Sequence, residues 1–290
     1  MRKLSSFLFA LLLFLACLFL PGQTPAPSNG PEGGQLPEEI LFGIPGEQDQ
    51  IISRKGFSVG YSFKYRQAVW TSYILTEENL QKKQVKRGAS FRVDPAVKYA
   101  PVRPKDYAGT GYDKGHLAPA ADMTWSVQSM ENSFFMSNIS PQIPGCNRGI
   151  WKRVEKQVRS WALREKKLCV ITGPVFLDTE KRLGKSSIPV PTAFYKVVLD
   201  LTPPMKMIAF LIPNEPSKKR IYFFMVPVDK VEEVTGYDFF SALDDELENA
   251  LEKECDADKW FGSTSSPGKD KDAARKPSPA KAERKKKQEK

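Results

Sequence analysis

The only histidine of the chain, His116, stands in a short segment that gathers groups able to take part in catalysis. Lys114 precedes it by two residues, Gly115 adjoins it, and Pro119 follows by three. Imidazole is the side chain whose ordinary pKa allows both uptake and release of a proton near neutral pH. Any imidazole base in this chain is therefore His116, and the glycine and proline indicate a tight, preorganised backbone around it.

Two asparagines downstream add amide oxygens to this set. Asn138 lies in the segment Ser137–Gln142, at the end of an expected strand, and Asn147 opens an expected helix. A base, a cation and amide oxygens are the groups that a metal-assisted phosphodiester hydrolase needs. Each asparagine also has a simpler interpretation, because asparagine is a common helix N-cap and its side chain readily bonds backbone groups at the end of a strand.

The order of these segments resembles one family, the DNA/RNA non-specific endonucleases, which are ββα-metal nucleases and include mitochondrial endonuclease G. The resemblance covers about residues 40–256. Because several pieces occur in the same order, the signal is far stronger than that of the Asp-Lys-Gly-His tetrad alone. The pieces that carry it are Asp113–His116, Ser137–Gln142, Asn147, Trp151, Glu155, Val226–Lys230 and Thr235–Phe240.

The resemblance implies a role for each of the polar residues. It makes His116 the general base and Asn147 the direct ligand of Mg²⁺, for which Mn²⁺ would substitute. Asn138 and Glu155 take the positions of supporting polar residues in the catalytic set, with the glutamate acting on the metal indirectly. The family's motif usually has arginine where this chain has Lys114, and lysine cannot grip two phosphate oxygens as a planar fork.

The family also places an arginine upstream, near the phosphate, and Arg87 and Arg92 are both candidates, with Arg87 slightly favoured. The simpler alternatives are a plain surface lysine at Lys114 and a solvated helix charge at Glu155. Glu155 follows Asn147 by eight residues, which is about 12 Å along an ideal helix. Either Glu155 serves the metal indirectly, or Asn147 lies in a looser first turn.

Hydrophobic patterning predicts a mixed α+β fold, and the resemblance adds a central antiparallel sheet flanked by helices with a ββα-metal motif. Apolar residues recur about every four positions over residues 147–166, which predicts an amphipathic helix. Shorter helices are expected at residues 231–234 and 239–251, and a polar loop at 77–86. Strands are expected at residues 67–75, 134–136, 168–176, 193–201, 207–212 and 221–228.

Both ends of the chain differ in composition from the middle. Arg2 and Lys3 precede the 14 apolar residues Phe7–Leu20, which predicts a signal peptide or N-terminal anchor over residues 1–22. We therefore expect a secreted or periplasmic protein, or one attached to a membrane through its N-terminus, with lipidation at Cys17 as one route. The other expected segments are a flexible lead-in at 23–40, the endonuclease domain at 41–262 and a disordered Lys-rich tail at 263–290.

The net charge of +10 is concentrated in the tail, where residues 269–290 hold ten Lys/Arg against four Asp/Glu. Residues 23–262 carry only +2, so the domain would bind a polyanion through a local patch. The tail is either a solubilising element or an electrostatic arm for nucleic acid. The expected function is an exported, metal-dependent endonuclease that cuts DNA and RNA with little sequence preference. The alternative is a catalytically weak or inactive nucleic-acid-binding protein of the cell envelope, and nothing in the sequence indicates an oligomeric state.

Overall fold

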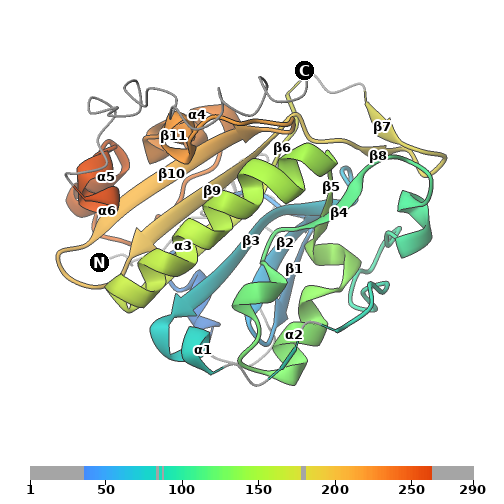
Figure 1. The fold of residues 1–290 in the computed structure, drawn as a ribbon, viewed down its shortest axis with the longest axis horizontal. Coiled ribbons are helices and arrows are strands. Elements are labelled where there is room, and N and C mark those ends of the chain that lie inside the picture. Colours follow the sequence, from blue (N-terminus) through green and yellow to red (C-terminus); the bar gives the residue numbers. More distant parts are fainter. Residues whose placement is uncertain (1–35, 83–84, 87, 178–180, 263–290) are drawn as a thin grey trace, which may run out of the picture.

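The computed structural model describes residues 36–82, 85–86, 88–177 and 181–262. Its largest element is a seven-stranded antiparallel sheet in the order β1-β2-β3-β6-β9-β10-β11 (Figure 1). These strands are β1 (Gln50–Arg54), β2 (Phe57–Ser62), β3 (Gln67–Thr76), β6 (Lys167–Val175), β9 (Ala193–Asp200), β10 (Lys206–Pro213) and β11 (Met225–Val226). The expected strands at 67–75, 168–176, 193–201 and 207–212 are thus confirmed, as is the α+β class.

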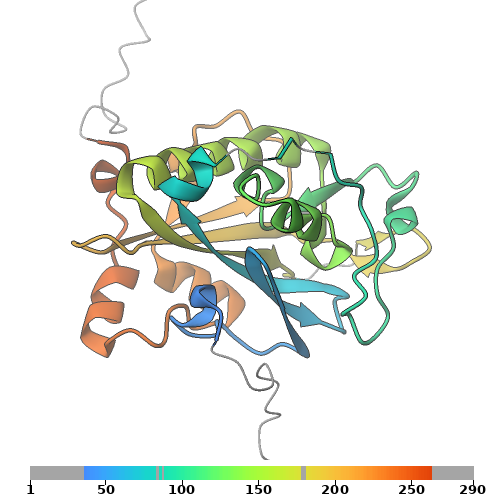
Figure 2. The same ribbon diagram turned by 90° about the horizontal axis from the view of Figure 1, so that it is seen from below.

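The sheet is buried on both faces, because a separate core packs against each of them. Neighbouring residues of a strand point to opposite faces, so one strand contributes to both cores. On β9, Val198 belongs to the core beneath helix α3 (Lys152–Glu165), whereas Val197 belongs to a second core beneath α4 (Val228–Thr235) and α5 (Asp245–Glu252). Figure 2 shows α3 on one side of the sheet and α4 and α5 on the other. Burial on both sides explains why the central strands read as nearly continuous apolar runs.

Helix α3 has the amphipathic pattern that the sequence predicts. Val154, Val158 and Trp161 are fully buried against the sheet. The indole nitrogen of Trp161 donates to the carbonyl oxygen of Trp260 at 2.8 Å, in helix α6 (Ala257–Phe261), and the two rings pack 4.7 Å apart. The C-terminal half of α3 is therefore held in place by the last described helix.

A smaller antiparallel pair, β4 (Asp113–His116) and β5 (Ile139–Gln142), lies beside the main sheet. After β5 the chain passes through the π-helical segment Cys146–Trp151 directly into α3. This order of two strands and a helix is the expected ββα motif. The pairing requires Gly115, because a Cβ at that position would lie 2.0 Å from the side-chain oxygen of Gln142.

Two expected elements are wrong for local reasons. The loop expected at 77–86 begins with helix α1 (Glu77–Gln81), because the side chain of Thr76 caps it by accepting from the backbone N–H of Asn79 at 3.0 Å. The strand expected at 134–136 is a turn that makes a single bridge, from Phe135 to Arg92. Its apolar residues pack inward from irregular backbone instead of from a strand.

The C-terminal third also differs from expectation. Most of the strand expected at 221–228 is the 3₁₀ turn Ile221–Phe224, and Pro227 then starts α4. Helix α5 begins at Asp245 instead of residue 239, because Asp244 caps it. The remaining short elements are α2 (Val127–Ser133), β7 (Arg182–Leu183), β8 (Ile188–Pro189) and the 3₁₀ turns Glu38–Ile40, Pro104–Tyr107, Ala120–Asp122 and Met136–Asn138.

The folded domain reaches back into the expected lead-in. Ile40 is buried, and the hydroxyl of Ser72 donates to the carbonyl oxygen of Glu39 at 2.6 Å. The expected signal or anchor at 1–22 and the expected tail at 263–290 lie outside the described residues. Among the residues that the structure describes, no helix is both long and apolar enough to cross a membrane.

Candidate active site

His116 ends β4 with its ring set against two phenylalanines. The imidazole is 7% exposed, lies edge-on to the Phe134 ring at 4.9 Å and lies 5.4 Å from the Phe91 ring. These contacts limit rotation of the imidazole, so its orientation is fixed by packing. A base held in one orientation is preorganised for proton transfer.

Asn147 is tied to the other end of the same strand. Its side-chain nitrogen donates to Asp113 Oδ2 at 2.9 Å. A carboxylate only accepts hydrogen bonds, so the amide nitrogen must face Asp113. The amide oxygen Oδ1 accepts no hydrogen bond from any residue that the structure describes. Asn147 therefore keeps one oxygen available for a cation.

Asp113 receives a second partner, the exposed Arg148. The guanidinium donates to both carboxylate oxygens, at 2.7 and 2.6 Å. Partial burial of Asp113 opposes its ionisation, but the hydrogen bonds from Arg148 and Asn147 outweigh that effect and hold its pKa below the usual range. Asp113 thus stays ionised and acts as the anchor of Asn147 throughout the neutral range.

The segment that carries Asn147 is not a regular helix. Gly149 has φ −104° and ψ −106° inside the π-helical stretch Cys146–Trp151, and α3 starts only afterwards. Such π-type interruptions are frequent at functional sites. Asn147 is not the N-cap of α3 but lies in the irregular segment before it, eight residues ahead of Glu155.

Lys114 shares an aromatic wall with the histidine. Its Nζ lies 5.4 Å from the centre of the Phe91 ring and 5.7 Å from that of Tyr107. The Phe91 ring also contacts His116, so Lys114 and His116 lie on the same side of β4. The half-buried Lys114 therefore packs beside His116 instead of extending freely into solvent.

Asn138 is buried completely and uses its amide on backbone groups. Its nitrogen donates to the carbonyl oxygens of Ala118 and Ser133, at 2.9 and 3.0 Å, and its oxygen accepts from the N–H of Ala118 at 2.9 Å. The family resemblance places Asn138 in the catalytic set, but this geometry makes it a positioning residue. It fixes the chain two residues after His116 and leaves no amide group for a substrate.

Glu155 acts electrostatically on a group of buried charged residues that sequence reasoning largely missed. Arg159, one turn further along α3, donates to the buried Asp122 at 2.7 Å, and Tyr73 donates to the same carboxylate at 3.0 Å. Lys196 completes the group from β9. The spacing of Glu155 and Arg159 by four residues is a signal that could have been used, whereas Asp122 had none.

Lys196 is fully buried, and its Nζ forms no hydrogen bond with the described residues. The ammonium lies 4.9 Å from the centre of the Trp151 ring and 5.9 Å from that of Tyr73. Burial lowers the pKa of Lys196 to about 8, against the opposing attraction of Glu155. A single lysine in an otherwise apolar strand was the available signal for this residue.

The structure describes only one of the two arginine candidates. Arg87 lies outside the described residues. Arg92 is held beside the site, since its backbone N–H donates to the carbonyl oxygen of Phe134 at 3.1 Å and its guanidinium lies 4.3 Å from the centre of the Phe135 ring. Arg92 directly follows Phe91, whose ring contacts His116.

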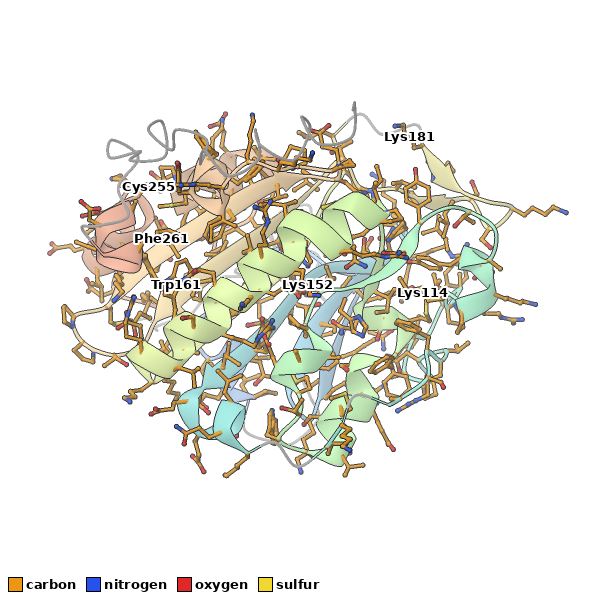
Figure 3. The ribbon with its side chains drawn as sticks, in the orientation of Figure 1. Lys114, Lys152, Trp161, Lys181, Cys255 and Phe261 are labelled. Atoms are coloured by element: carbon orange, nitrogen blue, oxygen red, sulfur yellow. The ribbon has the colours of Figure 1, made fainter. Side chains whose placement is uncertain are left out.

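A basic groove begins next to Asn147. It runs along the first turns of α3, and its exposed cations belong to that helix, to the π-helical segment before it and to the loop after β10. Figure 3 labels Lys152 on α3 and Lys114 on β4. The domain thus has a local positive patch despite its small net charge. The groove is lined by Arg148, Gly149, Lys152, Arg153, Lys156, Ser217 and Lys218.

Comparison with known proteins gives consistent matches over this architecture. The family model for DNA/RNA non-specific endonucleases matches residues 39–246. The mitochondrial endonuclease G of Bos taurus is 32% identical over 227 residues, which cover 73% of this chain and 76% of that protein. Nuclease C1 of Cunninghamella echinulata var. echinulata is 36% identical over 225 residues, covering 71% and 89% respectively.

A solved structure supports the same assignment. A chain in the crystal structure of the EndoG/EndoGI complex aligns with a TM-score of 0.68 at 28% identity, over 74% of this chain and 96% of that one. The family match spans the main sheet, the β4–β5 pair with His116, the π-helical segment with Asn147, and α3. This chain belongs to the DNA/RNA non-specific endonuclease family.

Proposed function

We propose that this protein is a Mg²⁺-dependent endonuclease that hydrolyses phosphodiester bonds of DNA and RNA, with His116 as general base and Asn147 as metal ligand. The observation that carries the proposal is the link across β4. Asp113 opens the strand that His116 closes, and it holds the Asn147 amide nitrogen at 2.9 Å. One short strand therefore positions both the base and the metal ligand.

The residues present fit a magnesium ion. Mg²⁺ binds oxygen ligands and usually keeps several waters, so it needs few protein groups. Asn147 Oδ1 would hold it, with Mn²⁺ as a substitute, and the half-buried Glu155 would support it from α3. When bound, the cation would stabilise the negative charge that develops on the phosphate.

The protein's own groups then have distinct tasks. A neutral His116 takes the proton from the attacking water, a contribution of about 10²–10⁴-fold. Lys114 places a positive charge on the same side of β4, where it attracts the phosphate. The basic groove beside Asn147 binds the flanking phosphates, and because phosphate contacts carry no sequence information, cleavage has little base preference.

We also propose that the protein is exported, as a secreted or periplasmic enzyme or one anchored through its N-terminus. The support is the apolar stretch Phe7–Leu20 behind Arg2 and Lys3. Mass spectrometry of the mature protein tests this. Loss of about the first 22 residues indicates a cleaved signal, a lipid on Cys17 indicates a lipid anchor, and an intact N-terminus in the membrane fraction indicates an uncleaved anchor. An intact N-terminus on protein that is not bound to membranes contradicts the proposal.

The central test is cleavage of supercoiled plasmid and of single-stranded RNA by the purified protein. Both should be cut with Mg²⁺ and left intact with EDTA, and added Mg²⁺ should restore cutting. The alternative function, a weak or inactive nucleic-acid-binding protein, predicts a shift of DNA in a gel without nicking. Binding without cleavage in both Mg²⁺ and Mn²⁺ would overturn the proposal.

We expect Lys114→Arg to keep or raise kcat/KM on plasmid DNA, because arginine grips two phosphate oxygens where lysine is a point charge. Lys114→Met is the matched control, since methionine has a side chain of similar length without the charge. We expect it to lose at least about tenfold of the activity, which is the scale of one charge-assisted hydrogen bond. A large loss in Lys114→Arg would mean that the pocket between Phe91 and Tyr107 is fitted to lysine.

Deleting residues 263–290 should weaken DNA binding and flatten its salt dependence, while single-turnover cutting at saturating DNA stays unchanged. Residues 269–290 carry a net +6 against +2 for residues 23–262. For each phosphate that the protein no longer neutralises, the steepness of log K against log salt falls by about one unit. The check is fluorescence anisotropy over a salt series. An unchanged slope would show that the tail does not engage DNA.

A further inference from the structure

Five carboxylates gather where α4 meets α5, on the face of the sheet opposite α3. They come from two helices and the loop between them, and they form two overlapping triads that share Glu252. None of the five forms an ion pair with a lysine or arginine in the part of the chain that the structure describes. The five residues are Asp229, Glu232, Asp238, Glu248 and Glu252.

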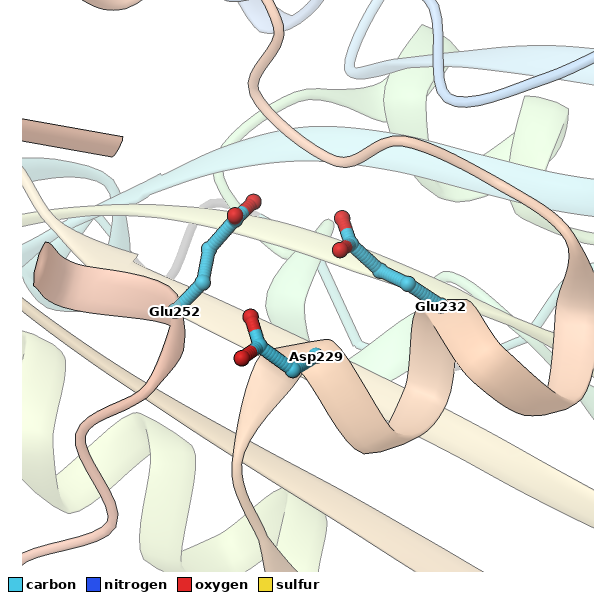
Figure 4. Close-up of side chains that lie close together, drawn as sticks. All are labelled: Asp229, Glu232 and Glu252. Carbon is cyan, nitrogen blue, oxygen red and sulfur yellow. The ribbon is translucent and has the colours of Figure 1, made fainter. Parts of the chain in front are cut away.

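The first triad converges on a common space. Figure 4 shows the carboxylates of Asp229, Glu232 and Glu252 turned toward one another. One oxygen from each lies within 4.8 Å of the others. Three oxygens at such separations surround a point at most about 2.8 Å from each, close to the 2.3–2.6 Å at which Ca²⁺ holds its ligands.

Glu252 supplies an observation beyond the clustering. Its side chain is 6% exposed, and its Oε1 is buried without a hydrogen-bond partner among the described residues. Glu232 is fixed beside it, because one of its oxygens accepts from the backbone N–H of Phe239 at 2.8 Å. Glu252 shares a side-chain hydrogen bond with Glu232, but its Oε1 stays a buried acceptor without a partner in the described part of the chain, which is unfavourable. A cation that binds oxygen would satisfy it.

The helices themselves disfavour these charges. Glu252 is the last residue of α5, and Glu232 lies in the last turn of α4. A helix C-terminus carries partial negative charge and favours cations over carboxylates. A bound cation would remove the conflict with the helix ends.

We propose that Asp229, Glu232 and Glu252 form a calcium-binding site that joins α4 to α5. The ligands are all carboxylate oxygens, without histidine or cysteine, which suits a hard cation. Their irregular geometry suits Ca²⁺ better than Mg²⁺, which demands a near-ideal octahedron. The ion would fasten the two helices over the core that contains Val231 and Leu251, and it is separate from the catalytic metal.

The test is thermal unfolding and calorimetric titration with CaCl₂ after treatment with EDTA. We use the Asn147→Ala background as well as the wild type, so that binding at the catalytic site does not contribute. At a calcium concentration about tenfold above the dissociation constant, the Tm should rise by about 3–6 °C in both proteins. The same concentration of MgCl₂ should give a clearly smaller shift.

Glu252→Gln keeps the shape of the side chain and removes the shared ligand charge, so its Tm should no longer respond to calcium. Glu246→Gln is the matched control, because it makes the same charge change on α5 outside the triads, and it should respond like the wild type.

Asp229→Asn provides a second variant at an exposed position, so the result does not depend on the buried residue alone. It should weaken calcium binding without abolishing it. The proposal is overturned if wild-type Tm does not respond to calcium, or if Glu252→Gln responds as strongly as Glu246→Gln. Neither outcome bears on nuclease activity, so failure here is distinct from failure of the proposed catalytic function.

Discussion

His116→Ala is expected to lower the single-turnover rate of plasmid cleavage by about 10²–10⁴-fold, the usual contribution of a general base. DNA binding and Mg²⁺ affinity should change little, because the proposed metal ligand is the amide of Asn147, which Asp113 and not His116 holds in place. The measurement is quenched single-turnover cleavage.

Asn147→Ala is the companion variant, and it should lose both cutting and metal affinity. Its amide oxygen is the proposed ligand, while its amide nitrogen only holds Asp113. A Mn²⁺ titration of each variant separates the two roles. If His116→Ala cleaves within about tenfold of the wild type, less than a general base contributes, the assignment of the base is wrong.

Lys196→Met is expected to leave the free energy of unfolding at pH 7 equal or higher, which is unusual for a fully buried residue. Burial lowers the pKa of Lys196 to about 8, so the folded state holds this proton less tightly than the unfolded chain, where lysine has a pKa of about 10.4. The charged form therefore opposes folding at neutral pH. Methionine has a similar shape and removes that charge.

The sign of the pH dependence follows from the same shift. Between about pH 8 and 10.5 the unfolded state binds more protons at this group than the folded state, so wild-type stability gains from Lys196 as pH rises through that window. The gain is on the order of 3 kcal/mol, from the difference between the two pKa values. It should be absent in Lys196→Met, and urea unfolding of both proteins at each pH gives the difference.

Lys206→Met is the matched control for this substitution. Lys206 lies on the neighbouring strand and forms ion pairs with Glu165 and Asp200 at 3.0 and 3.1 Å. Removing it should lower stability by about 1–3 kcal/mol, because Asp200 loses its ion pair and Glu165 keeps only Arg164. If Lys196→Met is destabilised as much as Lys206→Met, Lys196 contributes to folding. If it is stable but cuts slowly, its charge serves the group formed by Glu155, Asp122, Arg159 and Tyr73.

The sequence predicted the strands and the helix in which apolar residues form long runs or recur at a regular spacing. The central strands β3, β6, β9 and β10 and the amphipathic face of α3 were all expected, because long apolar runs and a spacing of about four residues leave few alternatives. β4 was not expected as a strand, since it has only four residues and they are Asp113–His116. Its pairing with β5 depends on close packing at Gly115, which no hydrophobic pattern reports.

The candidate site also has a part that the sequence could predict and a part that it could not. The order of His116, Asn147 and Glu155 along the chain was sufficient to bring them forward as a set. The partners of an amide cannot be predicted from its residue type, so the sequence could not separate Asn138, which bonds backbone, from Asn147, which bonds Asp113. Lys196 was overlooked because one lysine does not interrupt the strand pattern around it.

The shortness of β4 has a consequence for how this protein can evolve. Three residue steps, about 10 Å of extended chain, separate the anchor of the metal ligand from the base. An insertion or deletion there would shift the register by one and turn Lys114 and His116 to the other face, away from Phe91. Divergence in length should therefore fall outside Asp113–His116, in surface connections such as the one between β7 and β8.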